Sequence, residues 1–275
     1  ISDCGRGNSK QGFLRQEGNI MIQRMTNTEK VKELFEGWEE TLIWSCLQGV
    51  MGEIYADDAR NPVSAMAILG DFAFFAGEPD EELISYKPDW CHNEFIIMVP
   101  QNDAWAALIE KHYQEKAKKV SRYAIKKETD AFDKEKLKRI VASLPEEYEL
   151  RLIDREIYEI CQKMEWSRFW VALYRDYEEF QKLGLGVAIL KDGALVAGAS
   201  SYSSYKEGIE IEIDTNEPYR RKGLATVCGA RLILECLERN LYPSWDAQNL
   251  WSVALAKKLG YHYSHSYTAY EIRGY

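Results

Sequence analysis

The sequence predicts an α/β (α+β) fold, and three features of its second half support this most directly. Asp192-Gly193 separates two apolar runs, which is the pattern of a tight β-hairpin. Residues 208–215 alternate isoleucine with acidic side chains, as expected for a strand that buries one face. A loop containing Gly223 then leads into the apolar stretch 224–239, which we predict to be a helix.

The first half predicts the same kinds of element in series. Residues 27–48 carry apolar side chains at three- and four-residue steps, which predicts a helix. Apolar residues around Gly70-Asp71 predict a buried hairpin within 61–79, and residues 93–100 predict a strand. Residues 102–119 have a helical period and begin with asparagine, a good N-cap.

The elements between these regions suggest a division into two domains. Residues 121–128 predict a strand, 133–144 a helix, and 152–184 one or two further helices. We place a boundary near Val120, which gives an N-terminal α/β domain at 21–120 and a second domain at 121–275. The segment 1–20 is polar and contains glycines, so we expect it to be flexible.

Charge and hydropathy argue against two classes of partner. The 275 residues carry a formal net charge of −9, which argues against nucleic acid. Residues 111–127 form a locally basic stretch, which we interpret as a solvated face rather than a nucleic-acid site. No apolar run reaches the ~18 residues of a membrane span, so we expect no membrane partner.

The cysteines and histidines indicate no metal site. Six cysteines are widely scattered without a C-x-x-C pair, and the chain has only four histidines. Cys228 and Cys236 fall within one predicted helix, too far apart along its axis for a disulfide. We therefore expect reduced thiols and a cytoplasmic location.

The loop "RRKG", residues 220–223, allows two interpretations. Three consecutive cations could form a solvated turn. However, a helix N-terminus presents about four N–H groups without intrahelical partners and a partial positive charge, so cations there are unfavourable unless an anion binds. A glycine also lets a phosphate approach the backbone closely. We therefore predict an anion site at this loop.

Two motifs in the second half resemble those of the GNAT superfamily of acyl-CoA N-acyltransferases. The pattern Arg220-x-x-Gly223-x-Ala225 after a strand is similar to the family's Gln/Arg-x-x-Gly-x-Gly/Ala loop for the pyrophosphate of coenzyme A. Downstream, Asn249, Ser252 and the run "KLGY" at 258–261 are similar to a later family motif. The resemblance covers about residues 122–275 and suggests the group that includes the zwittermicin-A-resistance acetyltransferase.

The resemblance implies a mixed, mostly antiparallel sheet flanked by helices, preceded by an N-terminal half that is a degenerate GNAT-like unit. It implies acetyl-CoA as the cosubstrate and no metal. Asn249 would equally suit the role of N-cap for a helix at 250–259. The residues that the resemblance assigns to coenzyme A are Ile211, Ile213, Asp214, Thr215, Arg220, Arg221, Lys222, Gly223, Leu224, Ala225, Thr226, Asn249 and Ser252.

Acetyl transfer to an amine needs a base, because an alkyl ammonium titrates near ~10 in water. Glu212 and Glu210, on the polar face of the strand 208–215, are the candidate bases, and we rank Glu212 first because it lies nearer the loop. A solvated strand face would explain the same alternation. The resemblance also implies that a backbone N–H between Ile211 and Ile213 stabilises the oxyanion.

The general acid is not predicted. The family's usual tyrosine position, seven residues after Asn249, is Ala256 here. Tyr261, Tyr263 and Tyr267 are alternatives, although Tyr261 fits better as an aromatic core residue. A thiolate whose conjugate acid has a pKa near ~8.5 can also leave without an acid.

The predicted function is transfer of an acetyl group from acetyl-CoA to an amine of a small molecule, either a metabolite or an antibiotic. Tyr202 and Tyr205 are the candidate acceptor-binding residues, because their segment should lie beside the cleft. Two alternatives stay open: a non-catalytic acyl-CoA-binding sensor or scaffold, and a protein N-acetyltransferase. The sequence leaves the oligomeric state open, a dimer included.

Overall fold

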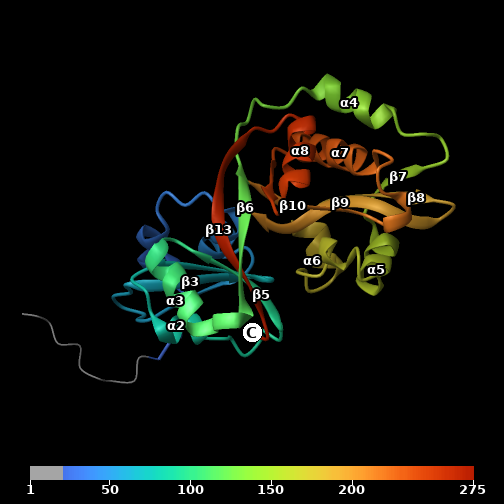
Figure 1. Ribbon diagram of the computed structural model, residues 1–275. Coiled ribbons are helices and arrows are strands. Elements are labelled where there is room, and N and C mark those ends of the chain that lie inside the picture. Colours follow the sequence, from blue (N-terminus) through green and yellow to red (C-terminus); the bar gives the residue numbers. More distant parts are fainter. Residues whose placement is uncertain (1–20) are drawn as a thin grey trace, which may run out of the picture.

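The computed structural model describes residues 21–275 (Figure 1). The segment 1–20, which we expect to be flexible, and Cys4 within it lie outside the described residues. The described chain forms two sheets with helices packed on them, and none of its helices is long and apolar enough to cross a membrane.

The first half contains short elements that agree with most of the sequence predictions. The hairpin with its turn at Gly70-Asp71 and the strand after it are confirmed. The helix predicted at 102–119 has its Asn102 cap but ends at Tyr113, and residues 117–119 belong to a strand. In chain order the elements are β1 (Gln23–Arg24), 3-10 turns at Thr28–Lys30 and Lys32–Phe35, α1 (Thr41–Gln48), β2 (Glu53–Ala56), β3 (Ser64–Leu69), β4 (Phe72–Gly77), α2 (Glu81–Ser85), β5 (Phe95–Pro100), α3 (Asp103–Tyr113), a 3-10 turn at Gln114–Lys116 and β6 (Ala117–Ile125).

The prediction of a single helix at 27–48 is wrong. Two 3-10 turns precede α1, because Gly37 adopts a φ of +75° that interrupts the helix. The apolar period still reports burial correctly, since Val31, Phe35 and Cys46 are all buried.

The second half places a five-stranded sheet between two groups of helices (Figure 1). Its predicted hairpin, alternating strand and two final helices are confirmed. The elements are α4 (Lys134–Ala142), β7 (Glu149–Leu152), α5 (Arg155–Lys163), a 3-10 turn at Arg168–Trp170, α6 (Tyr177–Leu183), β8 (Gly186–Lys191), β9 (Ala194–Tyr205), β10 (Gly208–Thr215), a 3-10 turn at Glu217–Tyr219, α7 (Leu224–Glu238), β11 (Tyr242–Ser244), β12 (Asp246–Ala247), α8 (Leu250–Leu259) and β13 (Tyr263–Arg273).

The two halves share a sheet. The strand order is β1-β2-β3-β4-β5-β13-β6-β12 in the larger sheet and β11-β10-β9-β8-β7 in the smaller one. β13 returns from the second half, pairs along β6 and continues beside β5, so that Tyr270–Arg273 lie opposite Phe95–Met98. Figure 1 shows β6 and β13 running together between the halves. The last strand therefore completes the sheet of the first half.

The sheets are mixed and mostly antiparallel, as the resemblance implies. Among the described strands, only β4–β5 and β10–β11 pair in parallel. In both halves the chain forms a hairpin, then a helix, then a strand parallel to the second strand of the hairpin. These elements are β3–β4, α2 and β5 in the first half, and β9–β10, α7 and β11 in the second. The first half is thus a reduced version of the second. Its helix α2 has 5 residues against 15 in α7 and is capped by the acidic Asp80.

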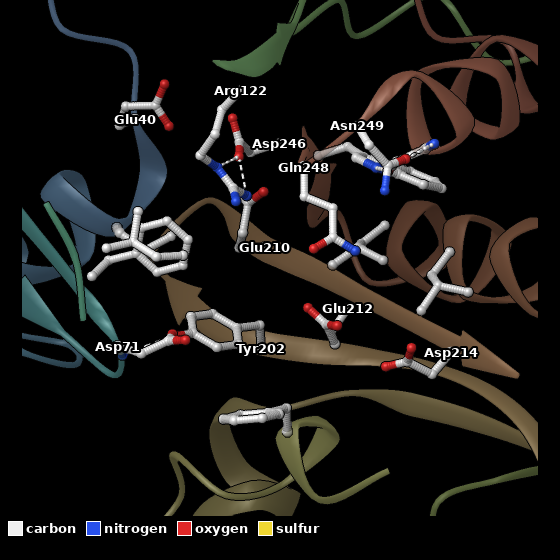
Figure 2. Close-up of a pocket in the computed structure, with 18 of the residues that line it drawn as sticks. Glu40, Asp71, Arg122, Tyr202, Glu210, Glu212, Asp214, Asp246, Gln248 and Asn249 are labelled. Carbon is white, nitrogen blue, oxygen red and sulfur yellow. Dashed lines mark hydrogen bonds and ion pairs between the residues drawn. The ribbon is translucent and has the colours of Figure 1, made fainter. Parts of the chain in front are cut away.

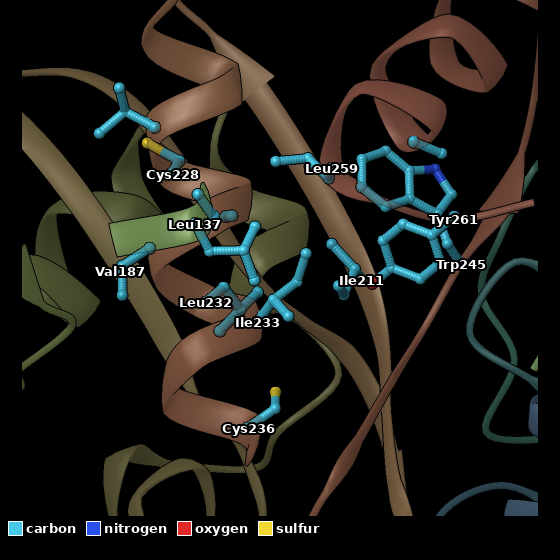
Figure 3. Close-up of a cluster of buried hydrophobic side chains, with 14 of the residues drawn as sticks. Leu137, Val187, Ile211, Cys228, Leu232, Ile233, Cys236, Trp245, Leu259 and Tyr261 are labelled. Atoms are coloured by element: carbon cyan, nitrogen blue, oxygen red, sulfur yellow. The ribbon is translucent and has the colours of Figure 1, made fainter. Parts of the chain in front are cut away.

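Helix α7 packs across the smaller sheet and forms the core of the second half (Figure 3). Leu232 and Ile233 of the helix, with Val187 and Ile211 of the strands, are buried in one cluster. Both helix cysteines are buried there. The five cysteines of the described part, Cys46, Cys91, Cys161, Cys228 and Cys236, are all buried thiols without a disulfide.

Candidate active site

The predicted anion loop lies at the N-terminus of α7. Gly223 is the N-cap, has a φ of +80°, and no side chain caps the helix. A Cβ built on Gly223 would meet no protein atom within 4 Å, so this backbone faces open space. Among the described residues, the N–H groups of Leu224 and Ala225 have no hydrogen-bond acceptor. An uncapped helix end of this kind suits an anion.

The three cations of the loop are exposed and have no carboxylate partner within the described chain. The Arg220 guanidinium donates to the Thr215 carbonyl at 3.3 Å, and the Lys222 ammonium lies 5.0 Å from the centre of the Tyr219 ring. Arg221 adopts a positive φ of +63°, uncommon for a residue with a side chain. The loop therefore concentrates positive charge where the helix dipole is already positive.

Strand β10 opens away from its parallel neighbour beside this loop. β10 pairs with β11 only from Gly208 to Glu210, opposite Tyr242–Ser244. The chain then leaves for the other sheet, where β12 pairs with β6. Along 211–215, β10 keeps its partner β9 but has no partner on the other edge in the described chain. The separating strands β10 and β11 leave a wedge-shaped gap between them, which we call the wedge. Alternate residues of 211–215 direct their N–H and C=O groups into it.

The wedge leads into a cavity of about 600 Å³ (Figure 2). Both halves of the chain line it. Eight residues predicted from the sequence lie on its wall: Tyr202, Glu210, Ile211, Glu212, Ile213, Asp214, Asn249 and Ser252. The remaining predicted residues, Tyr205, Thr215 and 220–226, are not on the cavity wall. The cavity thus extends along the opened segment of β10 as far as Asp214, and the loop lies beyond the end of that strand.

Glu210 stands where β10 and β11 separate. It is 7% exposed, and its Oε2 accepts a hydrogen bond from the Thr41 hydroxyl of the first half. Its other carboxylate oxygen, Oε1, is buried and has no partner in the described chain. Burial raises the pKa of Glu210 to about 7, against a lowering by the Thr41 hydrogen bond and a further raising by Asp246. A carboxyl with this pKa can exchange protons near neutral pH.

Glu212 and Asp214 lie further along the same face of β10 (Figure 2). Burial, and then the neighbouring Asp214 carboxylate, hold the pKa of Glu212 well above its ordinary value. Burial also raises the pKa of Asp214. Two close carboxyls resist joint ionisation, which is one physical cause of the raised pKa of Glu212.

Tyr202 and Tyr205, the tyrosines predicted to bind the acetyl acceptor, have different surroundings. In β9, Ser203 and Ser201 lie opposite the consecutive Glu210 and Ile211, so Tyr202 is the extra residue of a β-bulge. Its ring lines the cavity, and its hydroxyl donates to the Asp71 carboxylate and accepts from the Asp71 N–H at 3.1 Å. Tyr205 instead lies away from the cavity, with its hydroxyl 2.8 Å from the Ser244 hydroxyl.

Asn249 caps α8. Its Oδ1 accepts a hydrogen bond from the Ser252 N–H at 2.9 Å, as the capping interpretation predicts. The Ser252 hydroxyl in turn accepts from the Trp245 indole at 3.0 Å. The Asn249 side-chain NH₂ group is not used by these contacts, and the residue lines the cavity.

Comparison with known proteins agrees with this geometry. A sequence profile described as "GNAT acetyltransferase" matches residues 32–270. The chain belongs to the GNAT acetyltransferase family. Its match begins before α1, so both halves, and not only residues 122–275, belong to the region that the family describes.

Individual GNAT relatives extend this finding. A crystal structure of a GCN5-related N-acetyltransferase-like protein from Streptococcus suis 89/1591 is 50% identical, with a TM-score of 0.84, over 90% of this chain and 98% of that one. The "Uncharacterized N-acetyltransferase YdfB" of Bacillus subtilis (strain 168) is 27% identical over 91% of this chain and 98% of its own length. A tandem GNAT protein from the clavulanic acid biosynthesis pathway, 11% identical with a TM-score of 0.51, covers 93% of this chain and 99% of its own and shows the fold alone. The protein is an acetyltransferase.

The three tyrosines considered as general acids of this GNAT protein differ in burial and in whether they line the cavity. Ala256 is buried in the core, so α8 presents no hydroxyl at that position. Tyr261 is also buried, and its hydroxyl donates to the Pro243 carbonyl at 2.6 Å, as expected for a core residue. Tyr263 is 38% exposed and not on the cavity wall. Of the three alternatives, Tyr267 alone lines the cavity.

The sequence prediction missed polar residues that the first half and β12 bring to the site. The Arg122 Nε donates to Asp246 Oδ1 at 2.7 Å, and the Tyr267 hydroxyl donates to Asp246 Oδ2 at 2.7 Å. Glu40 and Asp71 line the cavity from the first half (Figure 2). These residues stand outside both GNAT-like motifs, so no local signal marked them. In the described chain no group of His, Cys, Asp and Glu is arranged to hold a metal.

Proposed function

We propose that this acetyltransferase transfers the acetyl group of acetyl-CoA to an amine of a small molecule. One observation carries the proposal: the opened segment of β10 joins an uncapped, cationic helix end to a cavity in which the buried Glu210 has an unpaired carboxylate oxygen. This arrangement provides an anion site, a channel for an extended arm and a proton acceptor in one line.

The pyrophosphate of coenzyme A fits the loop, and its arm fits the wedge. The N–H groups of Leu224 and Ala225, with Arg221 and Lys222, would hold the pyrophosphate. Open backbone groups along 211–215 would pair with the amides of the arm. This direction places the thioester at the far end of the wedge from the loop, beside Glu210. A backbone N–H between Ile211 and Ile213 is then the donor to the oxyanion.

We assign the role of base to Glu210 and not to Glu212. The thioester end of the wedge lies at Glu210, whereas Glu212 lies further toward the loop. The incoming ammonium gives one proton to Glu210, and the nitrogen lone pair then attacks the thioester carbon. The C–N bond forms, the C–S bond breaks, and a second N–H proton neutralises the thiolate. The products are an amide, free coenzyme A and one released proton.

The cavity favours a small acceptor over a protein tail. It is closed on one side by residues of the first half: Glu40, Leu42, Asp71, Phe72, Phe74 and Ile97. A pocket walled by both halves suits a compact molecule, whereas a protein N-acetyltransferase would need an open groove. The non-catalytic sensor interpretation is less favoured, because a sensor has no use for a buried, unpaired carboxylate oxygen. The GNAT-like N-terminal half also supports a finer placement beside the zwittermicin-A-resistance acetyltransferase.

The test is release of free thiol from acetyl-CoA in the presence of a panel of small amines. We expect amine-dependent thiol release, with the amide identified by mass spectrometry. Coenzyme A binding without turnover across the panel would support the sensor instead. Acetylation of peptides but of no small amine would support the protein N-acetyltransferase.

A further inference from the structure

The cavity is unusually acidic. Among the described residues on its wall, seven are Asp or Glu and one, Arg122, is cationic. An amine that is merely acetylated needs one proton acceptor, so most of these carboxyls are not explained by the proposed reaction.

Arg122 does not neutralise the cavity as a whole. Its guanidinium pairs with Asp246 at 2.5 Å and lies 4.9 Å from the centre of the Phe72 ring. Asp246 also accepts from Tyr267, so this carboxylate is satisfied. The single cation on the wall thus forms its ion pair with Asp246, and it lowers the pKa of Glu40 and Glu212 only in part.

Glu40 has no such partner. It directly precedes Thr41, the residue that donates to Glu210, and its side chain makes no capping hydrogen bond to α1. Within the described chain, no Lys, Arg or His lies at ion-pair distance from it. Burial, and then Asp246, raise the pKa of Glu40 to about 8, because the Lys127 and Arg122 cations offset these effects only in part. A cation bound there would relieve this electrostatic cost.

Glu210 gives a second and independent indication of a ligand. It is more than nine-tenths buried, its Oε1 has no partner, and it lines the same cavity. A buried acceptor without a donor is costly, and an ammonium group supplies three donors and the compensating charge. Glu40 and Glu210 approach the cavity from different halves, joined through Thr41 (Figure 2).

We infer that the natural acceptor carries at least two amino groups, one acetylated beside Glu210 and a second that stays protonated and binds Glu40. The acceptor class is therefore a short di- or polyamine with an apolar spacer. Phe72, Phe74 and Trp245 supply apolar wall for that spacer. This inference rests on the proposed function, because it concerns the acceptor of the same reaction.

The experiment compares three acceptors with the same carbon chain: diaminobutane, aminobutanol and butylamine. We expect diaminobutane to have a kcat/KM higher than that of aminobutanol by about tenfold or more, since a hydrogen bond to a charged group contributes substantially. The preference should shrink as salt rises. In Glu40→Gln the preference should largely disappear, because KM should rise much more for the diamine than for butylamine.

Glu39→Gln is the matched control, because Glu39 is exposed and does not line the cavity. It should retain the preference for the diamine. Equal kcat/KM for all three acceptors in the wild-type protein would overturn the inference while leaving the acetyltransferase proposal intact. Equal loss for all three in Glu40→Gln would remove Glu40 as the second subsite. Thiol release with none of the amines would count against the proposed function itself.

Discussion

Replacing Glu210 with glutamine should inactivate the protein and stabilise it at alkaline pH. Glutamine keeps the size of the side chain and an oxygen that can accept from Thr41. It removes a charge that the Thr41 hydrogen bond and Lys127 compensate only in part, since Oε1 has no partner in the described chain. Residues placed for catalysis are often destabilising in this way.

The magnitude follows from the pKa. Burial raises the pKa of Glu210 from 4.5 to about 7, a difference of about 2.5. At ~1.36 kcal/mol per pH unit, this corresponds to about 3 kcal/mol as an upper value. Because the folded pKa is the higher one, the unfolded chain loses this proton first. The stability that the group confers is therefore complete below pH 4.5 and is lost as the pH rises to about 7.

Urea unfolding of the wild-type protein and Glu210→Gln at pH 5 and pH 8 measures this effect. We subtract the free energy of unfolding of the wild type from that of the variant at each pH. This difference should be larger at pH 8 than at pH 5, by up to about 3 kcal/mol. Thiol release should fall by roughly 10²-fold or more in the variant. A variant that is inactive but gains no stability at pH 8 would refute the reasoning that burial of the Glu210 carboxyl is incompletely compensated.

Three further substitutions test the remaining parts of the site. Thr41→Val removes the hydrogen bond that lowers the pKa of Glu210, so the ascending limb of the pH–rate profile should move to higher pH; an unmoved limb would separate Glu210 from that titration. Glu212→Gln should change turnover by less than about tenfold, because Glu212 is not the assigned base; a loss as large as that of Glu210→Gln would return the role to Glu212. Gly223→Glu should abolish coenzyme A binding, measured by calorimetry, with a stability cost of about 1 kcal/mol from the positive φ. Gly193→Glu is its control, since Gly193 has a φ of +78° and equally open surroundings in a distant turn; equal binding by both variants would remove the loop from the site.

Local signals predicted the loop and the elements around it. The Asp192-Gly193 turn, the alternation in 208–215 and the Asn249 cap each depend on a few neighbouring residues, and each has the predicted structure. The helix predicted at 27–48 failed because its apolar period reported burial but not the break at Gly37. A period indicates which side is buried, not whether the backbone stays helical.

The acidic cavity could not be predicted in the same way. Thr41 and Glu210 are 169 residues apart in the chain, and Asp71 and Tyr202 are 131 residues apart. Their contacts exist because β13 returns to the first half and the two halves close on each other. The β-bulge that places Tyr202 in the cavity depends on the pairing of β9 with β10 and leaves no composition signal.

The ranking of the two candidate bases illustrates the difference. Along the sequence, Glu212 is nearer the loop, and the sequence offers no other criterion for ranking the two acids. The structure adds the point where β10 and β11 separate, and this point lies at Glu210. The proposed position of the base therefore depends on where a neighbouring strand ends, which the motif does not contain.

A crystal structure with coenzyme A tests the central claim most directly. We predict that the pyrophosphate accepts hydrogen bonds from the N–H groups of Leu224 and Ala225, that the arm lies in the wedge beside 211–215, and that the thiol ends next to Glu210. A pyrophosphate bound away from the N-terminus of α7, or a thiol that ends outside the cavity, would contradict the account.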